Sequence, residues 1–360
     1  MNKLNEARNK INTIDKEMAK LFEERMEAAK MVAEYKAEHA LPIFDSAREL
    51  EVINKNSSYI EDPVIKEYYV SFLKETMNIS KSFQARLIEG LKVAYSGVEG
   101  AFAYIAANKM FPNANYYSYH NFEEAYKSVE DGLCDVCVLP LENSFAGEVG
   151  VVMDLLFSGS LYINQVVELE VVHNLLAKKG SKKEQIKKVI SHPQAISQCS
   201  KFINENKFEV IEAENTAYAA KMVSVSDDFE VAAIASNETA KLYDLEIIES
   251  NINEKRNNTT RFGAFTRSLN EQKNTNSSSH YILVFTVKNE AGALAKTLNI
   301  IGSYGFNMRS LRSRPMKELL WNYYFYVELE GNIDSAEGKE MLKALHVFCD
   351  KLKIVGRYSI

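Results

Sequence analysis

An uninterrupted apolar seam near the start of the chain constrains its fold more than any other sequence feature. Apolar side chains recur at heptad spacing, and no glycine or proline interrupts them. The seam positions are Leu4, Ala7, Ile11, Ile14, Met18, Leu21, Arg25, Ala28, Val32 and Tyr35. Because this spacing places the seam on one face of a helix, we expect one long α-helix here.

Two further helical stretches follow a turn near Pro42. They cover about Ser46 to Ser57 and Pro63 to Ile88, and the second has a proline in its first turn, where proline is well tolerated. The sequence therefore predicts an all-helical domain over residues 1–90.

The pattern changes at Leu91, from where short apolar strands alternate with helices as far as Phe265. This alternation predicts an α/β domain over residues 91–268, with a largely parallel or mixed sheet. The first expected elements are Leu91–Tyr95, Ala101–Met110, Phe122–Asp131 and Asp135–Pro140.

A polar stretch from Asn270 to Ser279 predicts a flexible linker. Beyond it, residues 280–360 predict a third domain with the order βαββαβ, which is the ferredoxin-like α+β arrangement. Its expected elements are Tyr281–Val287, Ala291–Tyr304, Asn307–Arg312, Asn322–Leu329, Ser335–Leu352 and Ile354–Tyr358.

The composition is typical of a globular protein, with 46% hydrophobic and 26% charged residues. The start of the chain is charged, and no run of about 18 apolar residues occurs, so we expect a cytoplasmic protein without a membrane span. A net charge of −6 provides no general attraction for nucleic acid or anionic lipid. An anionic small substrate must therefore be held by local clusters of arginine and lysine.

The four cysteines do not predict a disulfide framework in a cytoplasmic chain of this length. Cys134 and Cys137 form a C-x-x-C pattern, which also occurs in metal and redox sites. They lie, however, in an apolar stretch that reads as a strand, where residues three apart face opposite sides. We expect buried strand cysteines and no metal.

Arg25 stands at a seam position that otherwise holds apolar side chains. A buried cation without a partner costs several kcal/mol, so Arg25 needs an anion. That anion is either a carboxylate of the chain, such as Glu49, or a ligand in a pocket.

The helical domain resembles the all-helical chorismate mutase family, and the match covers nearly the whole domain. The matching residues are Arg8, Arg25, Lys36, Asp45, Arg48, Glu49, Ser80 and Gln84. The resemblance implies that Arg25 and Arg48 bind the carboxylates of chorismate, while Lys36 and Gln84 donate to the ether oxygen. It also implies that Ser80 and Glu49 hold the substrate hydroxyl, with Asp45 nearby.

Such a site needs no nucleophile, metal or cofactor, because a Claisen rearrangement requires only a folded substrate and donors placed where charge develops. Arg8 lies roughly 25 Å along the helix from Arg25, at 1.5 Å rise per residue. It therefore cannot easily serve the same pocket in its own chain. We expect a homodimer, or a higher homo-oligomer, in which Arg8 reaches the partner's pocket, as the resemblance also implies.

Four segments of the α/β domain each follow or lie in an apolar strand: Val93–Phe102, Leu139–Gly147, Ser191–Cys199 and Asn258–Phe262. Ligands of open α/β sheets tend to bind at strand ends, and helix N-termini offer N–H groups to anions. The first segment does not fit the G-x-G-x-x-G fingerprint, so we expect no NAD.

These segments resemble prephenate dehydratase. The resemblance implies two lobes, as in periplasmic-type binding proteins, made of about 91–167 with 251–267 and of about 168–250. It makes Thr260 the principal catalytic residue, and Arg261 with helix N-termini the anchors of a carboxylate. The further pocket residues are Glu142, Asn143, Ser191, Gln198 and Glu214. We expect His192 to pack or to cap a helix. Ala101 and Ala103 depart from the hydroxyl residues of many relatives, which puts a catalytic role of that turn in doubt.

The third domain resembles the ACT domains of this enzyme family, which bind phenylalanine. The resemblance rests on Gly292-Ala293-Leu294, which opens the first helix, and on Ser313-Arg314-Pro315 at the end of the second strand. Asn307 is a further candidate contact. Arg312 departs from the glutamate usual in relatives. Feedback inhibition by phenylalanine is the implied role.

Two other interpretations of the function are open. The chain could be a regulator whose two lobes and sensor domain bind ligands without catalysis, or it could retain only one activity. The mutase residues and the Thr260-Arg261-Phe262 motif favour a bifunctional enzyme of phenylalanine biosynthesis, because a binding module needs neither.

Overall fold

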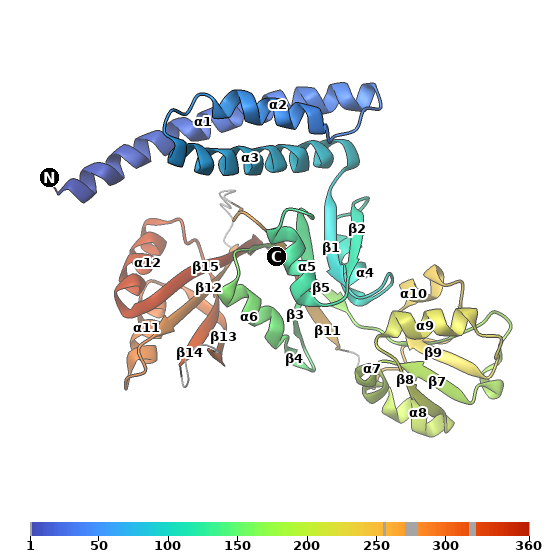
Figure 1. Ribbon diagram of the computed structural model, residues 1–360. Coiled ribbons are helices and arrows are strands. Elements are labelled where there is room, and N and C mark those ends of the chain that lie inside the picture. The colour runs from blue at the N-terminus through green and yellow to red at the C-terminus, as the bar shows by residue number, and fades with distance from the viewer. Residues whose placement is uncertain (1, 255–256, 271–278, 317–321, 360) are drawn as a thin grey trace. The chain divides into compact units, whose positions relative to one another are not determined.

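The structure is a computed structural model, and it describes residues 2–254, 257–270, 279–316 and 322–359. The chain divides into two compact units, Met1–Lys92 and Val93–Ile360. Unit 1 is helical, whereas unit 2 contains two sheets with helices packed against them (Figure 1). No helix of the described part of the chain is both long enough and apolar enough to cross a lipid bilayer.

Unit 1 consists of the helices α1 (Lys3–Glu38), α2 (Ser46–Ser57) and α3 (Pro63–Glu89). Each begins at a side chain that accepts a hydrogen bond from a first-turn amide, namely Asn2, Asp45 and Asp62. Such caps satisfy amides that have no partner within the helix. The predicted all-helical domain is confirmed.

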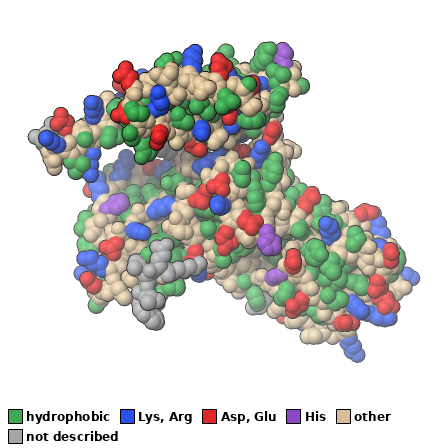
Figure 2. Space-filling model, viewed as in Figure 1, with side chains coloured by type: hydrophobic (Ala, Val, Ile, Leu, Met, Phe, Trp, Pro, Cys, Tyr) green, Lys and Arg blue, Asp and Glu red, His purple; other side chains and the backbone are tan. Residues whose placement is uncertain are grey.

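The first half of α1 is uncovered in the single chain. Every residue from Asn2 to Arg25 is exposed, and the buried residues of this helix are Ala29 and Ala33. The expectation that Arg25 is buried is therefore wrong for the single chain. Figure 2 shows hydrophobic side chains mixed with charged ones on the surface of this unit. The predicted seam exists, but no described part of the chain packs over its first half.

The larger sheet of unit 2 has ten strands in the order β13-β14-β12-β15-β5-β11-β3-β1-β2, with β4 paired to β3. It is mixed: β1 and β3 are parallel, whereas β11 is antiparallel to both β3 and β5. Its strands are β1 (Lys92–Ser96), β2 (Asn115–Tyr119), β3 (Val136–Asn143), β4 (Gly147–Glu148), β5 (Tyr162–Glu170), β11 (Thr259–Thr266), β12 (Ser279–Val287), β13 (Asn307–Pro315), β14 (Tyr323–Glu330) and β15 (Cys349–Ser359).

The smaller sheet has five strands in the order β10-β6-β9-β7-β8. They are β6 (Asn174–Ala177), β7 (Lys188–Ser191), β8 (Glu209–Glu212), β9 (Val231–Ala235) and β10 (Glu246–Glu249). The helices α7 (Pro193–Gln198), α8 (Ser200–Asn206), α9 (Thr216–Val225) and α10 (Asn237–Leu242) belong to the same stretch of chain, with a short 3-10 turn at Lys183–Gln185. We call this part the small lobe.

The large lobe comprises β1 to β5 and the returning β11, with the helices α4 (Phe102–Met110), α5 (Phe122–Glu130) and α6 (Gly150–Ser158). The predicted two-lobed α/β fold is thus confirmed. Cys134 and Cys137 are both buried, and all four cysteines are free.

The C-terminal part has the predicted order βαββαβ, with α11 (Ala293–Ser303) between β12 and β13 and α12 (Ala336–Phe348) between β14 and β15. The last helix was expected to reach Leu352, which is wrong. β15 begins at Cys349, where it pairs with Val287 of β12. Of the expected linker, residues 271–278 lie outside the described part, and Ser279 belongs to β12.

The sheets of the large lobe and the C-terminal domain are continuous. β15 pairs in parallel with β5 at Gly356 and Ile163. One apolar cluster joins the two parts, because Leu139 and Phe265 of the large lobe belong to it together with Val284 of β12. Burial of a continuous apolar cluster stabilises this junction.

A buried ion pair lies at the same junction. The Arg261 guanidinium donates to both carboxylate oxygens of Glu328, at 2.9 and 3.0 Å, and also to the Tyr358 hydroxyl. The Glu328 side chain is 2% exposed. Burial alone would raise the pKa of Glu328, but hydrogen bonds from Arg261 and Tyr358 outweigh burial and hold this pKa below its ordinary value. Glu328 is therefore ionised at neutral pH.

Replacing Glu328 with alanine would leave the Arg261 charge without its main partner. We expect unit 2 to lose about 3 kcal/mol of stability, near the lower end for breaking a buried ion pair. Urea unfolding followed by near-UV circular dichroism measures this loss. Glu330→Ala is the matched control, because Glu330 lies on the same strand and its partner Arg309 is exposed. Equal losses in both variants would contradict the assignment.

Candidate active sites

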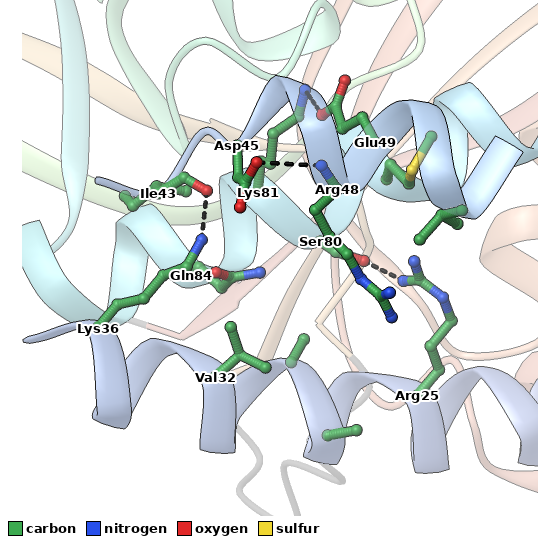
Figure 3. Close-up of a pocket in the computed structure, with 14 residues that line it drawn as sticks. Arg25, Val32, Lys36, Ile43, Asp45, Arg48, Glu49, Ser80, Lys81 and Gln84 are labelled. Carbon is green, nitrogen blue, oxygen red and sulfur yellow. Dashed lines mark hydrogen bonds and ion pairs between the residues drawn. The ribbon is translucent and has the colours of Figure 1, made fainter. Parts of the chain in front are cut away.

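Unit 1 contains a cavity of about 400 Å³ between its three helices, which we call the helical pocket. Figure 3 shows Arg25 and Lys36 reaching from α1 towards α3, with Arg48 reaching in from α2. Seven of the predicted mutase residues line it, namely Arg25, Lys36, Asp45, Arg48, Glu49, Ser80 and Gln84. Residues up to 59 positions apart in sequence are thus brought to one place, since Arg25 and Gln84 share this wall.

The two acidic residues of the helical pocket are already paired. Asp45 caps α2 by accepting from the Arg48 amide at 3.0 Å. Glu49 forms an ion pair of 2.6 Å with Lys81. The alternative in which Glu49 neutralises Arg25 is therefore not what the structure shows.

Apart from Lys81, the described cationic side chains of the pocket bind neutral acceptors or an exposed acid. Arg25 donates to the Ser80 hydroxyl, and Lys36 donates to the Ile43 carbonyl at 2.6 Å. Arg48 pairs with Glu51 at 2.7 Å, a contact that is largely exposed on both sides. Burial lowers the pKa of Arg25 from its ordinary value, although that value is far above neutrality. The pocket therefore holds positive charge that no buried carboxylate cancels among the described residues.

Gln84 is buried, and its carboxamide oxygen has no hydrogen-bond partner within the described residues. A buried acceptor without a partner costs about 1–3 kcal/mol, so a ligand hydroxyl that donates to this oxygen recovers that energy, while the Gln84 NH2 group can donate to a second ligand atom. Arg8 is absent from the pocket wall and lies on the exposed half of α1.

Unit 2 contains a second cavity, of about 430 Å³, between its large and small lobes, which we call the interlobe cavity. Asn143, Thr260 and Phe262 line it from the large lobe, and His192, Gln198 and Glu214 line it from the small lobe. Four of the predicted dehydratase residues, Asn143, Gln198, Glu214 and Thr260, therefore meet here.

The Thr260 hydroxyl has a defined direction. The Asn143 carboxamide oxygen accepts from the Phe145 and Ala146 amides, at 2.9 Å each. Its NH2 group must therefore be the part that contacts Thr260 Oγ1 at 2.9 Å. Because the Thr260 oxygen accepts this bond, its own hydrogen remains available to donate into the cavity.

Helix N-termini supply the positive potential of the interlobe cavity, whose described wall contains no lysine or arginine. Ala101 and Phe102 at the start of α4, Val149 before α6, and Thr216 at the start of α9 all line it. No side chain caps α4 or α6. The Phe102 and Ala103 amides of α4 lie on the cavity wall and are free to bind an anion, whereas the first-turn residues of α6 are not on this wall and the Val152 amide bonds to the Val149 carbonyl.

Three predicted dehydratase residues are not on this wall, and their assignment is corrected. Arg261 points to the opposite face from Thr260, because successive side chains of a strand alternate, and it binds Glu328. Glu142 forms an ion pair with Arg312. Ser191 is fully buried and donates to the Ile234 carbonyl at 2.7 Å, which ties β7 to β9.

His192 caps α7, as expected: its Nδ1 accepts from the Gln194 amide at 3.2 Å. Ala101 and Ala103 lie on the cavity wall, so the first turn contributes backbone and apolar surface there. The sequence analysis missed His173, which is buried against the cavity, and the role of Asn258. Only the position of Asn258 at the start of the Asn258–Phe262 segment could have drawn attention to it.

Comparisons with known proteins assign three families to successive parts of the chain. Family profiles match chorismate mutase type II at residues 7–85, prephenate dehydratase at residues 93–269 and the ACT domain at residues 281–347. The bifunctional chorismate mutase/prephenate dehydratase of Neisseria gonorrhoeae is 32% identical over 98% of this chain and 95% of its own length. The chain belongs to the bifunctional chorismate mutase/prephenate dehydratase family.

Solved structures resemble unit 2 of this family member. The prephenate dehydratase of Staphylococcus aureus is 25% identical, and the match covers 75% of this chain and 100% of its own, with a TM-score of 0.67. GqqA, described as a quorum quenching acylase, is 29% identical over 74% of this chain and 97% of its own, with a TM-score of 0.69. The fold of unit 2 is therefore known from experiment in other proteins.

The predicted effector residues of the ACT domain lie at two separate places. Gly292 starts α11 at φ +80°, with Ala293 and Leu294 in the first turn. Asn307 opens β13 and donates to Glu330 at 3.2 Å. Ser313 lies later on β13.

Arg314 and Arg312 contact the large lobe. Arg314 pairs with Glu148 at 3.0 Å and with Asp154 at 2.9 Å, and Arg312 pairs with Glu142 and Glu148. Arg314 is thus occupied by dehydratase carboxylates in this structure. At position 312, where relatives usually have glutamate, Arg312 places a positive charge opposite Glu142 and Glu148 of the β3–β4 hairpin.

Proposed function

We propose that this chain catalyses both reactions of its family, the rearrangement of chorismate to prephenate in the helical pocket and the conversion of prephenate to phenylpyruvate in the interlobe cavity. The observation that carries the second half is the Thr260 hydroxyl, which Asn143 orients as a donor into the cavity. We also propose the division into a mutase domain (1–90), a dehydratase domain (91–268) and an ACT domain (280–360).

In the helical pocket, Arg25 and Arg48 bind the two carboxylates of chorismate. The rearrangement breaks the ether bond as a carbon–carbon bond forms, so negative charge develops on the ether oxygen. Lys36 and Gln84 donate to that oxygen, where preorganised donors stabilise the transition state. Ser80 and Glu49 hold the ring hydroxyl. Asp45 caps the start of α2 by accepting a hydrogen bond from the Arg48 amide. No cofactor or metal takes part.

In the interlobe cavity, the ring carboxylate of prephenate leaves as CO₂ and its electron pair forms a ring double bond as the hydroxyl departs. Thr260 donates a hydrogen bond to the departing oxygen, on which negative charge develops. The free first-turn amides of α4 bind the remaining carboxylate, a role that Arg261 cannot serve from the opposite face. Gln198 and Glu214 complete the polar wall.

The working unit is a homodimer, or a larger assembly built from it. The exposed seam at Leu4, Ile11, Ile14, Met18 and Leu21 offers apolar surface for a second copy of α1. An antiparallel pairing brings Arg8 of one chain to the helical pocket of the other. Four free cysteines fit a reducing compartment, which supports a cytoplasmic location.

Phenylalanine, the end product, binds the ACT domain between paired subunits and lowers dehydratase activity more than mutase activity. Gly292 lets the backbone approach a ligand, and the first-turn amides of α11 suit a carboxylate. Arg312 and Arg314 connect β13 to the large lobe and provide a route for this coupling.

Mixing two inactive variants tests the mutase assignment and the shared site together. Arg8→Ala and Arg25→Ala should each lose mutase activity and retain dehydratase activity. After subunit exchange, mixed dimers hold one intact site, so about a quarter of the wild-type mutase rate should return. Chorismate consumption measures it. Mass spectrometry of mixed dimers verifies that subunits have exchanged. If no mutase activity returns after verified exchange, the shared site is contradicted.

Thr260→Val should lower the dehydratase kcat by about 100-fold to 1,000-fold, as for removal of one oxyanion donor. Thr260→Ser keeps the hydroxyl and should retain more activity. Phenylpyruvate formation at saturating prephenate measures both. Thr259→Val is the matched control, because Thr259 is adjacent but does not line the cavity. A full rate in Thr260→Val would remove the catalytic assignment.

Gly292→Val should abolish phenylalanine binding in calorimetry and the inhibition of the dehydratase, because a branched side chain at φ +80° is strained and blocks the ligand's approach. Gly305→Val is matched for strain: Gly305 has φ +82° and equally open surroundings, but lies at the other end of α11. Gly305→Val should preserve phenylalanine binding. It should also preserve the coupling free energy between phenylalanine binding and the dehydratase site, about 1–3 kcal/mol. No binding to wild type at millimolar phenylalanine would contradict the proposal.

A further inference from the structure

His173 is a buried titratable residue that the proposed chemistry does not use. It lies between β5 and β6, is 2% exposed, and packs edge-on against Phe102 with 5.9 Å between ring centroids. Its Nε2 is 3.0 Å from the Gln198 carboxamide oxygen. Both aromatic rings line the interlobe cavity.

A chain of hydrogen bonds connects this histidine to Thr260. The Asn143 NH2 group donates to Asn258 Oδ1 at 2.7 Å as well as to Thr260. Asn258 in turn donates to Gln198 Oε1 at 2.8 Å, the atom that His173 also contacts. Three side chains, joined by four hydrogen bonds, therefore link Thr260 to a histidine 87 positions away in sequence.

The direction of every bond in this chain follows from its first member. Backbone amides fix the Asn143 oxygen as an acceptor, so its NH2 group donates and Asn258 Oδ1 accepts. Asn258 then presents its NH2 group to Gln198, which makes Gln198 Oε1 an acceptor. An acceptor cannot bond to a bare ring nitrogen, so His173 Nε2 must carry a hydrogen.

Packing alone does not account for a histidine at this position. With the hydrogen on Nε2, the other ring nitrogen, Nδ1, is a buried acceptor that has no partner within the described residues. A phenylalanine would fill the same space without stranding a polar atom. Burial lowers the pKa of His173 to about 4, so the ring is neutral at the pH of the cell and adds no charge to the cavity.

We infer that His173 is a positioning residue of the dehydratase: together with Asn258 it holds Gln198 Oε1, so that the Gln198 NH2 group faces the ligand as a donor beside the Thr260 hydroxyl, which Asn143 orients. With Gln198 Oε1 held by two donors, the NH2 group has no acceptor in the described part of the chain. Both donors suit a carboxylate or a departing hydroxide. The inference rests on the proposed dehydratase function and deepens it.

Steady-state kinetics of the full chain on prephenate test the relay. His173→Phe preserves the ring packing and removes the donor, so kcat should fall about fivefold to tenfold, which corresponds to one neutral hydrogen bond, while KM changes little. In His173→Gln, the side-chain NH2 can donate from near the place of Nε2, so kcat should return to within about threefold of wild type. Near-UV circular dichroism of the same samples reports whether unit 2, which contains His173, is folded.

Equal loss in the Phe and Gln variants, or a full rate in the Phe variant, would overturn the relay. Wild type that leaves prephenate unchanged would instead refute the proposed function itself. A measurement on the unsubstituted chain tests the relay even if wild type is inactive or a variant fails to fold. Two-bond 1H–15N spectra of histidine-labelled wild type should show the neutral Nε2–H tautomer of His173, and the Nδ1–H tautomer would refute the inferred direction of the chain.

Discussion

The alternation of side chains along β11 determines how unit 2 is arranged. β11 lies between β3 and β5, with Thr260 and Phe262 on the wall of the interlobe cavity and Arg261 on the opposite face. There Arg261 binds Glu328 and Tyr358 of the ACT domain. A strand cannot rotate one residue without its neighbours. The proposed catalytic face and the contact with the ACT domain are therefore two sides of the same short segment.

The two cavities attract anions by different means. The helical pocket uses the full charges of Arg25, Lys36 and Arg48, which no buried carboxylate cancels there. The interlobe cavity relies on helix N-termini and neutral donors held in fixed directions. Full charges bind a dicarboxylate strongly, whereas oriented neutral donors strengthen their bonds as charge develops on a leaving oxygen. This difference fits a rearrangement in one cavity and an elimination in the other.

Local signals were enough to predict the helices and to single out Arg25, whereas the other residues of the helical pocket came from the resemblance to the chorismate mutase family. The bounds of α2 follow from Asp45 as its cap, and the pocket residues share one face of each helix. The end of α12 was misjudged, because apolar residues continue from Leu345 to Leu352 in a pattern that suits helix and strand alike. Long-range partners had no local signal: Glu328 lies 67 positions from Arg261, and Gln198 lies 25 from His173.

The pairing of β15 with β5 has a consequence for any attempt to separate the parts of unit 2. An exposed strand edge presents unpaired N–H and C=O groups that can recruit other chains. β15 shields this edge at Ile163, and the ACT domain also covers the apolar cluster around Val284 and Phe265. A chain cut before Ser279 would uncover both and would be prone to aggregation. The ACT domain is thus a cover that keeps the sheet of the large lobe from associating edge to edge.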